Sequence, residues 1–262
     1  MRKECNAAQL VRIWTLYRRE VRRFLAVATQ TVAGPAVTTL LFLAVFAVVM
    51  TRRGQPQAVG SVPYLTFLAP GLVMMAMAQN AFANSSSSLL IAKIQGNITD
   101  FLMAPLSPSE FVAGFALGAV TRGLLVGAAV AVAMWPFVPL GLAHPAFALF
   151  HTLAACLLLA LVGILGGLWA QKMDQLGAVT SFVVTPLTFL SGTFYSAADL
   201  PPLFQAAVHL NPFFYMIDGF RYGITGHTDG SLAAGLAVMV GTNLLLAVAC
   251  HRLVATGWRL QS

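Results

Sequence analysis

Six apolar stretches, each about long enough to cross a lipid bilayer, take up most of this chain of 262 residues. A helix that spans a bilayer needs about 20 predominantly apolar residues. Only 9% of the residues are charged, whereas about 25% are charged in a typical soluble domain. The stretches cover residues 25–50, 63–91, 110–134, 146–170, 175–194 and 231–255. The sequence therefore predicts an all-α membrane protein whose transmembrane domain, residues 25–255, has six transmembrane helices.

The placement of Lys and Arg predicts how these helices are oriented. Cytoplasmic loops of membrane proteins carry an excess of Lys and Arg. With a cytoplasmic N-terminus, eleven of the 15 Lys and Arg lie in inner segments and three lie in outer segments. We therefore expect both termini in the cytoplasm, with residues 256–262 as an inner tail.

The first part of the chain, residues 1–24, combines basic charge with an amphipathic pattern. Its apolar positions recur at helical spacing and are Leu10, Ile13, Trp14, Tyr17, Val21 and Phe24. The pattern predicts a cytoplasmic amphipathic helix in the membrane interface, with membrane lipids as partners and no nucleic acid. A signal peptide is the alternative, but its apolar core would be only about 7–15 residues long.

Residues 195–228, between the fifth and sixth stretches, are apolar but contain three prolines and isolated charges. Backbone of this kind is tolerated near a bilayer only where protein buries it or where it lines a cavity. We therefore predict an outer re-entrant helical hairpin that acts as a gate. Its candidate polar residues are Asp199, Asn211, Asp218 and Arg221. Because Asp218 and Arg221 are three residues apart, we expect them to pair.

The inner loop, residues 92–110, contains the signals of a short helix. Thr99 and Asp100 are typical helix-start residues. Phe101 and Leu102 would form an apolar face, and Pro105 would end the helix. A short, exposed apolar helix is suited to a groove in a partner protein. It is equally suited to a simple connector that lies on the bilayer, and the segment alone does not decide between the two.

Side chains inside the second and fifth stretches are candidates for lining a transport path. They are Gln79, Asn80 and Asn84 in the second stretch, and Phe182, Thr185, Thr188 and Phe189 in the fifth. An amide near the middle of a bilayer needs a partner, so hydrogen bonding between helices is an equally good explanation for each. Arg122, in the third stretch, is either a path residue or a structural partner of another polar group.

The sequence contains no pattern that predicts an enzyme. A phosphate-binding loop requires a Gly-Lys pair, which this sequence lacks. Its histidines form no His-x-x-x-His pair, and Cys5, Cys156 and Cys250 are too far apart for a zinc or disulfide framework. We therefore expect no catalytic residue, no metal site and no cofactor bound by this chain.

Three motifs, in this order, resemble the permease subunits of ABC type 2 exporters. The first opens the second stretch and comprises Tyr64, Phe67, Leu68, Pro70, Gly71 and Leu72. The second lies in the inner loop and comprises Gly96, Asn97, Leu102, Pro105, Leu106, Ser107, Pro108 and Glu110. The third covers the outer hairpin and comprises Leu190, Ser191, Gly192, Phe194, Leu200, Pro201, Asn211, Pro212, Asp218, Gly219, Phe220 and Arg221. The chain departs from the pattern at Ile94-Gln95, where many relatives carry charged residues.

The resemblance implies a permease subunit of an ATP-driven exporter in a bacterial inner membrane. Two such subunits, identical or paralogous, would bind two cytoplasmic ATPase subunits, which carry the ATP and Mg²⁺. The inner loop would couple to the ATPase through Gly96, Asn97, Thr99, Asp100, Phe101, Leu102 and Pro105. The second and fifth spans would line the path between protomers. Because the candidate path residues mix aromatic side chains with amides, we expect an amphipathic or lipid-linked cargo. The alternative from another class is a non-ABC polytopic membrane channel or assembly scaffold.

Overall fold

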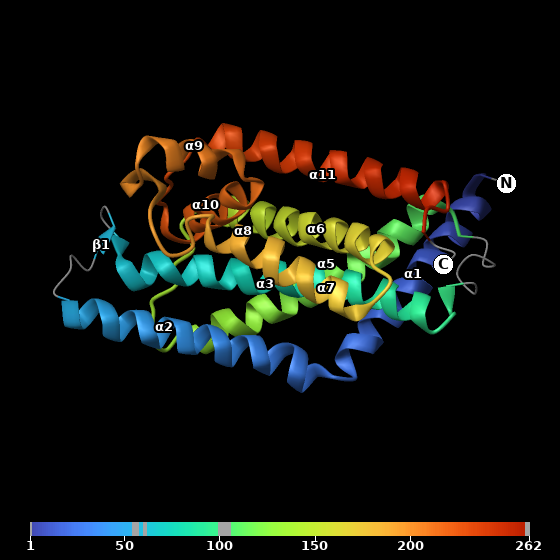
Figure 1. The fold of residues 1–262 in the computed structure, drawn as a ribbon, viewed down its shortest axis with the longest axis horizontal. Coiled ribbons are helices and arrows are strands. Elements are labelled where there is room, and N and C mark those ends of the chain that lie inside the picture. The colour runs from blue at the N-terminus through green and yellow to red at the C-terminus, as the bar shows by residue number, and fades with distance from the viewer. Residues whose placement is uncertain (1, 54–57, 60–61, 99–105, 260–262) are drawn as a thin grey trace.

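Long helices lie side by side along one axis of the molecule (Figure 1). The computed structural model describes residues 2–53, 58–59, 62–98 and 106–259. The start of α1 (Arg2–Leu25) and the end of α11 (Leu232–Ala255) lie at one end, which we call the terminal end. The strand β1 (Ala58–Val59), which pairs with β2 (Val62–Pro63), lies at the opposite end, which we call the hairpin end.

Five helical segments of the described residues are long and apolar enough to cross a membrane. They are Thr29–Val49, Tyr64–Ile94 (α3), Pro108–Met134 (α5), Pro145–Trp169 (α6) and Leu232–Ala255 (α11). The predicted second, third, fourth and sixth spans match α3, α5, α6 and α11 within one helical turn. The prediction of an all-α membrane protein is therefore confirmed.

Two wide, π-helical turns interrupt the helices just before a proline. The turn η1 (Thr29–Ala33) precedes Pro35 at the start of α2 (Gly34–Arg53), and η2 (Thr180–Val184) precedes Pro186. Proline has no N–H, and its ring clashes with the preceding helical turn, so the helix widens there as at a π-bulge.

The predicted fifth span, residues 175–194, is shorter and more irregular than expected. It consists of α7 (Met173–Val179), η2 and α8 (Thr185–Phe189), and Gly192 then turns the chain with a left-handed φ of 73°. Figure 1 shows the segment running beside α3 and α6 toward the hairpin end. The described residues thus supply five helices of spanning length, and a sixth crossing by this segment stays a prediction.

The central helix, α3, is buried on almost every side. It packs against α5, α6 and α10 (Pro212–Thr225). Small residues allow this close approach. A Cβ at Gly167 of α6 would lie 2.9 Å from the carbonyl oxygen of Ser86, and a Cβ at Gly163 would collide with the Ser85 hydroxyl. Membrane helices commonly associate through such small residues.

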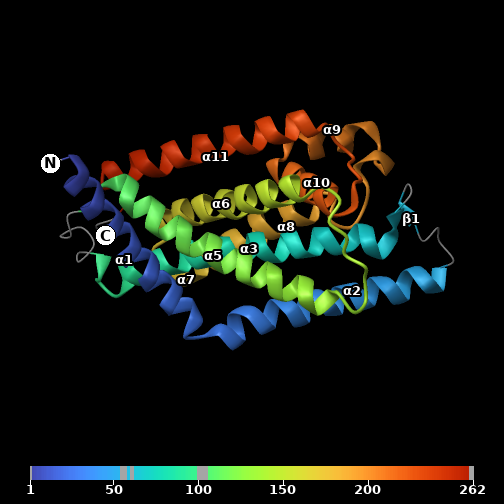
Figure 2. The same cartoon turned by 180° about the vertical axis from the view of Figure 1, so that it is seen from behind.

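The peripheral helices α2 and α11 expose apolar side chains, and Figure 2 shows both at the edge of the molecule. Leu41 of α2 and Leu244 and Leu245 of α11 are among the exposed residues. Soluble monomers rarely expose such apolar surface. Lipid or a second membrane subunit can cover this apolar surface. A helix tolerates such surroundings because it satisfies its own backbone hydrogen bonds and needs none from water.

The segment between α8 and α11 is a helical hairpin. That it lies on the outer side and is re-entrant stays a prediction. The hairpin contains η3 (Ala197–Asp199) and α9 (Pro202–Leu210), which lead into α10. Asn211 caps α10, because its side-chain oxygen accepts a hydrogen bond of 3.0 Å from the Phe213 N–H. Both α9 and α10 start with a proline, at a position where a helix leaves the N–H unpaired.

Candidate coupling loop, transport path and outer gate

Arg221 of α10 joins three parts of the hairpin end. Its side chain is fully buried, and its guanidinium carbon lies 3.7 Å from the centre of the Phe67 ring. Its Nε donates to the Phe67 carbonyl oxygen at 3.2 Å, and its Nη2 donates to the Gly192 carbonyl oxygen at 2.6 Å. Arg221 therefore ties α10 to the start of α3 and to the turn after α8.

The expected pair between Asp218 and Arg221 is wrong, because each residue has another partner. Asp218 accepts hydrogen bonds from the Thr228 hydroxyl at 2.7 Å, the Asp229 N–H at 2.8 Å and the Gly230 N–H at 3.1 Å. These donors occupy both carboxylate oxygens. The ion pair of Arg221 is with Asp229, at 3.9 Å from Nη1 to Oδ2. Asp218 thus holds the loop before α11.

Asp229 is the hub of this cluster, which sequence reasoning missed. Its carboxylate accepts from the Ser196 hydroxyl at 2.8 Å, the Ala197 N–H at 3.1 Å and the His227 imidazole at 3.0 Å. Burial lowers the pKa of Arg221 to about 10, and Asp218 and Asp229 oppose this shift. Arg221 is therefore cationic at neutral pH, and Asp229 is its paired counter-ion.

The remaining predicted gate residues differ in their roles. Asn211 donates to the Leu187 carbonyl oxygen at 3.1 Å and to the Ser191 hydroxyl at 2.9 Å, so it ties the end of α8 to the start of α10. Asp199 is exposed on η3, outside the hydrogen bonds of the Arg221 cluster. The structure thus brings Asn211, Asp218 and Arg221 into the bracing of the hairpin but not Asp199.

The amides of α3 form hydrogen bonds inside the subunit. Asn80 accepts from Arg122 Nη2 at 3.0 Å and donates to the Ala76 carbonyl oxygen at 3.0 Å. Asn84 is fully buried and accepts from Arg23 Nη2 at 2.9 Å. Between the two readings of Arg122, this geometry favours structural pairing.

Other predicted path residues lie nearer the surface of the subunit. Phe182 is 80% exposed, and Gln79, Thr185 and Phe189 are half-buried. Thr188 is buried and donates to the Thr185 carbonyl oxygen at 2.8 Å. The predicted set is therefore divided between the interior and an outward-facing wall.

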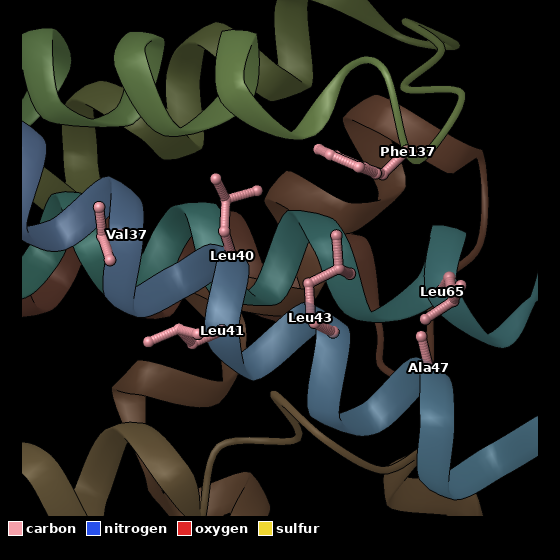
Figure 3. Close-up of a pocket in the computed structure, with 8 residues that line it drawn as sticks. Val37, Leu40, Leu41, Leu43, Ala47, Leu65 and Phe137 are labelled. Carbon is pink, nitrogen blue, oxygen red and sulfur yellow. The ribbon is translucent and has the colours of Figure 1, made fainter.

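An apolar groove of about 450 Å³ lies between α2, the start of α3 and the segment after α5. Its lining residues are Val37, Leu40, Leu41, Leu43, Ala44, Ala47, Leu65 and Phe137. Figure 3 shows the side chains of Leu65 and Phe137 facing those of α2 around this groove. The described residues that line the groove include no polar side chain to orient a cargo, so we do not assign it to the transport path.

The inner loop is described only at its two ends. Gly96 has a left-handed φ of 74° just after α3, and Asn97 is exposed. The other predicted coupling residues lie outside the described residues and are Thr99, Asp100, Phe101, Leu102 and Pro105. At the far end of the loop, Ser107 and Glu110 form a reciprocal capping box that starts α5.

Charged residues of α1 attach this helix to the membrane-spanning helices, which sequence reasoning also missed. Glu20 is fully buried, accepts from the Ser88 hydroxyl at 2.8 Å and lies 3.4 Å from Arg23 Nη2. Arg12 pairs with Glu110 at 2.8 Å. The signal was Glu20 itself, which is the one acid between residues 9 and 25.

The contacts of Arg221 and Asp229 hold the hairpin end together. Those of Glu20 and Arg12 attach α1 near the terminal end. No three His, Cys, Asp or Glu side chains of the described residues gather as a metal site. The arrangement holds helices and loops together through buried polar contacts.

Known transport and nodulation proteins match this chain, one of them over nearly its whole length. It is 36% identical over 253 residues to the inner membrane transport permease YadH of Escherichia coli (strain K12), which covers 96% of this chain and 98% of that protein. It is 26% identical over 189 residues to nodulation protein J of Sinorhizobium fredii (strain NBRC 101917 / NGR234), which covers 69% of this chain and 70% of that protein.

The sequence profile of the ABC-2 type transporter family matches residues 11–225, from within α1 to the end of α10. The match confirms the resemblance drawn from the three motifs and identifies a membrane transport permease. The chain belongs to the ABC-2 type transporter family.

Proposed function

We propose that this chain is the permease subunit of an ATP-driven exporter in a bacterial inner membrane. The observation that carries the proposal is its near full-length similarity to an inner membrane transport permease. Membership of the family implies a separate ATP-binding subunit, which would hold the ATP and Mg²⁺. This chain would then supply the substrate path and the surface on which the ATPase acts.

In this proposal α7, η2 and α8 make the sixth crossing, and both termini are cytoplasmic. The start of α1 and the end of α11 at one end of the molecule support an even number of crossings. The excess of Lys and Arg at this end supports a cytoplasmic location.

The inner loop would transmit the closure of the ATPase to the helices on either side of it. Its last residues join α5 directly through the Ser107–Glu110 capping box. The pair between Arg12 and Glu110 links the same point to α1. A force on the loop therefore acts on α1 and α5 together, because a buried carboxylate with two partners is costly to release.

The path would lie between two copies of the chain, against the exposed wall of η2 and α8. Phe182 and Val183 are exposed there. At the end of the same segment, Phe42 of α2 lies 6.5 Å from Phe189 and 6.1 Å from Phe194 between ring centres. An exposed aromatic surface on a membrane-spanning unit suits contact with a second subunit and with an amphipathic cargo.

The Arg221 cluster would hold the outer hairpin as a rigid cap over this path. Its contacts reach α3, η3, the turn after α8 and the loop before α11. Outward release would then require the cap to move as one body, because separating its parts exposes a buried charge.

Cysteine cross-linking tests whether the wall faces a second copy. In a variant without native cysteines, Phe182→Cys is expected to give a disulfide-linked dimer in membranes under oxidation. Leu245→Cys is the matched control, because it is 71% exposed on α11, at another edge of the subunit. Cross-linking through position 245 but not through position 182 would reject the proposed interface.

The alternative of a passive channel or scaffold predicts that transport is independent of ATP. Everted membrane vesicles, to which candidate lipids or glycans and either ATP or a non-hydrolysable analogue are added from outside, distinguish the two. Uptake that is identical with both nucleotides would favour the passive alternative.

A further inference from the structure

A groove between α1 and α5 lies apart from the proposed path. It has a volume of about 460 Å³, and its lining residues are Leu10, Ile13, Trp14 and Tyr17 of α1 and Leu117 and Thr121 of α5. Figure 2 shows α1 lying across α5 near the terminal end. The hydroxyls of Tyr17 and Thr121 lie 3.2 Å apart, so the polar groups of the groove are engaged with each other.

One strip of α1 changes from apolar to cationic along its length. Leu10, Trp14, Arg18 and Arg22 follow one another at intervals of four residues, which places neighbours in the series on adjoining turns. Leu10 is 68% exposed, Trp14 is 61% exposed, and both arginines are exposed. Glu20 is buried, so among the described residues of this strip no exposed acid neutralises Arg18 and Arg22.

The wall that α5 contributes lies within a membrane-spanning helix. Leu117 and Thr121 are nine and thirteen residues after Pro108, the first residue of α5. At a rise of 1.5 Å per residue, these positions are about 14 and 20 Å from the start of the helix. A soluble partner that docks on the tip of α5 would not reach this wall, whereas an acyl chain of the bilayer would.

We propose that this groove binds an anionic phospholipid from the leaflet at the terminal end. The long side chains of Arg18 and Arg22 extend back toward the N-terminus of α1, so they reach the phosphate at the level of Trp14, and the acyl chain packs below it against Tyr17 and Leu117. Aromatic side chains favour the membrane interface, and arginines place their charge at head-group level while their stems cover apolar surface. The site needs neither ATPase nor cargo, so it stands independently of the proposed transport function.

The groove discriminates between lipids by charge, because its apolar wall accepts any acyl chain. An arginine near an anionic membrane surface favours binding by about fivefold. Two arginines therefore predict a preference of up to about 25-fold for phosphatidylglycerol over phosphatidylcholine. The preference is expected to fall steeply with salt, because exposed charges are screened.

Fluorescence quenching by brominated lipids tests the proposal on the full-length chain in nanodiscs. The probes are phosphatidylcholine discs that contain either brominated phosphatidylglycerol or brominated phosphatidylcholine at equal content. The signal of Trp14 is the difference between the unsubstituted protein and Trp14→Phe. The test variant is Arg18→Gln with Arg22→Gln. The matched control is Lys172→Gln with Arg252→Gln, which removes two exposed cations elsewhere.

The expected result is stronger quenching of Trp14 by brominated phosphatidylglycerol, a preference that the test variant loses and the control variant keeps. Equal quenching by the two lipids would overturn the proposal, as would a preference that survives in the test variant. Absence of Trp14 quenching by either lipid would overturn it too, because protein would then cover the groove.

Discussion

Replacing Asp229 with Ala is expected to loosen the outer hairpin without unfolding the membrane helices. The side chain of Asp229 is 3% exposed, and its carboxylate lies 3.9 Å from the fully buried guanidinium of Arg221. The substitution removes this counter-ion and the acceptor of hydrogen bonds from Ser196 and Ala197. Arg221 retains its bonds to two carbonyl oxygens and its contact with Phe67, so it stays in place but is unpaired.

The magnitude follows from these contacts. Breaking a buried ion pair by removing one partner costs about 3–5 kcal/mol, and each buried donor left without an acceptor costs about 1–3 kcal/mol. The ion pair is long, and water would reach the Ser196 hydroxyl once the hairpin loosens. We therefore expect a loss of about 3–5 kcal/mol of local stability, which is about a hundredfold or more in the opening equilibrium.

Hydrogen–deuterium exchange of the protein in nanodiscs measures this opening. Protection of amides in residues 196–200 and 226–230 is expected to fall by about a hundredfold in Asp229→Ala, and by less in Asp229→Asn, which keeps an acceptor. Asp199→Asn is the control, because Asp199 lies exposed on the same hairpin. Equal protection in Asp229→Ala and Asp199→Asn would refute the role of Asp229 as a hub.

Three further outcomes are expected. Phe101→Asp should leave membrane insertion intact but release the ATPase in pull-downs, because an apolar anchor dominates such a contact. Normal transport by this variant would show that the inner loop does not couple the ATPase to transport. Cysteines at Asn97 and Leu142 should react with an impermeant maleimide from the cytoplasmic side and from the outer side, respectively; labelling of both from one side would contradict the topology. Glu20→Gln keeps an acceptor for Ser88 but removes the charge opposite Arg23, so it should lower the free energy of unfolding by about 1–3 kcal/mol. An unchanged melting temperature in detergent would show that the buried pair of Glu20 and Arg23 contributes little to stability.

Hydropathy and proline placement were sufficient to predict the long helices and the helical hairpin, because both are local signals. The bounds of α3, α5, α6 and α11 agree with the predicted spans. The π turns before Pro35 and Pro186 show where local signals become less exact. A proline marks a place where a helix can be distorted, but the widening of the preceding turn depends on how the helix packs.

The hub at Asp229 was not predictable from local sequence. Its partners Ser196 and Ala197 lie 33 and 32 residues earlier in the chain. They meet Asp229 only because α9 and α10 fold back. The expected pair of Asp218 and Arg221 failed for the same reason, since the loop before α11 supplies closer donors to Asp218.

The pattern of α1 predicted two faces but not their environments. In water, a helix usually turns its apolar face toward the protein. Here Leu10 and Trp14 are exposed, while Glu20 is buried against α3 and α5. A lipid surface accepts the apolar face, so the polar face is free to form ion pairs within the protein.

The central claim is that this chain works as the membrane part of an ATP-driven transporter. The most direct test is to purify the tagged full-length chain from membranes of its own host and to identify by mass spectrometry what remains bound. The account predicts an ATP-binding cassette ATPase in about equal amount to this chain, with ATP hydrolysis in nanodiscs that falls when Phe101→Asp is introduced. A folded, monodisperse chain that carries no ATPase and whose transport is unaffected by ATP would contradict it.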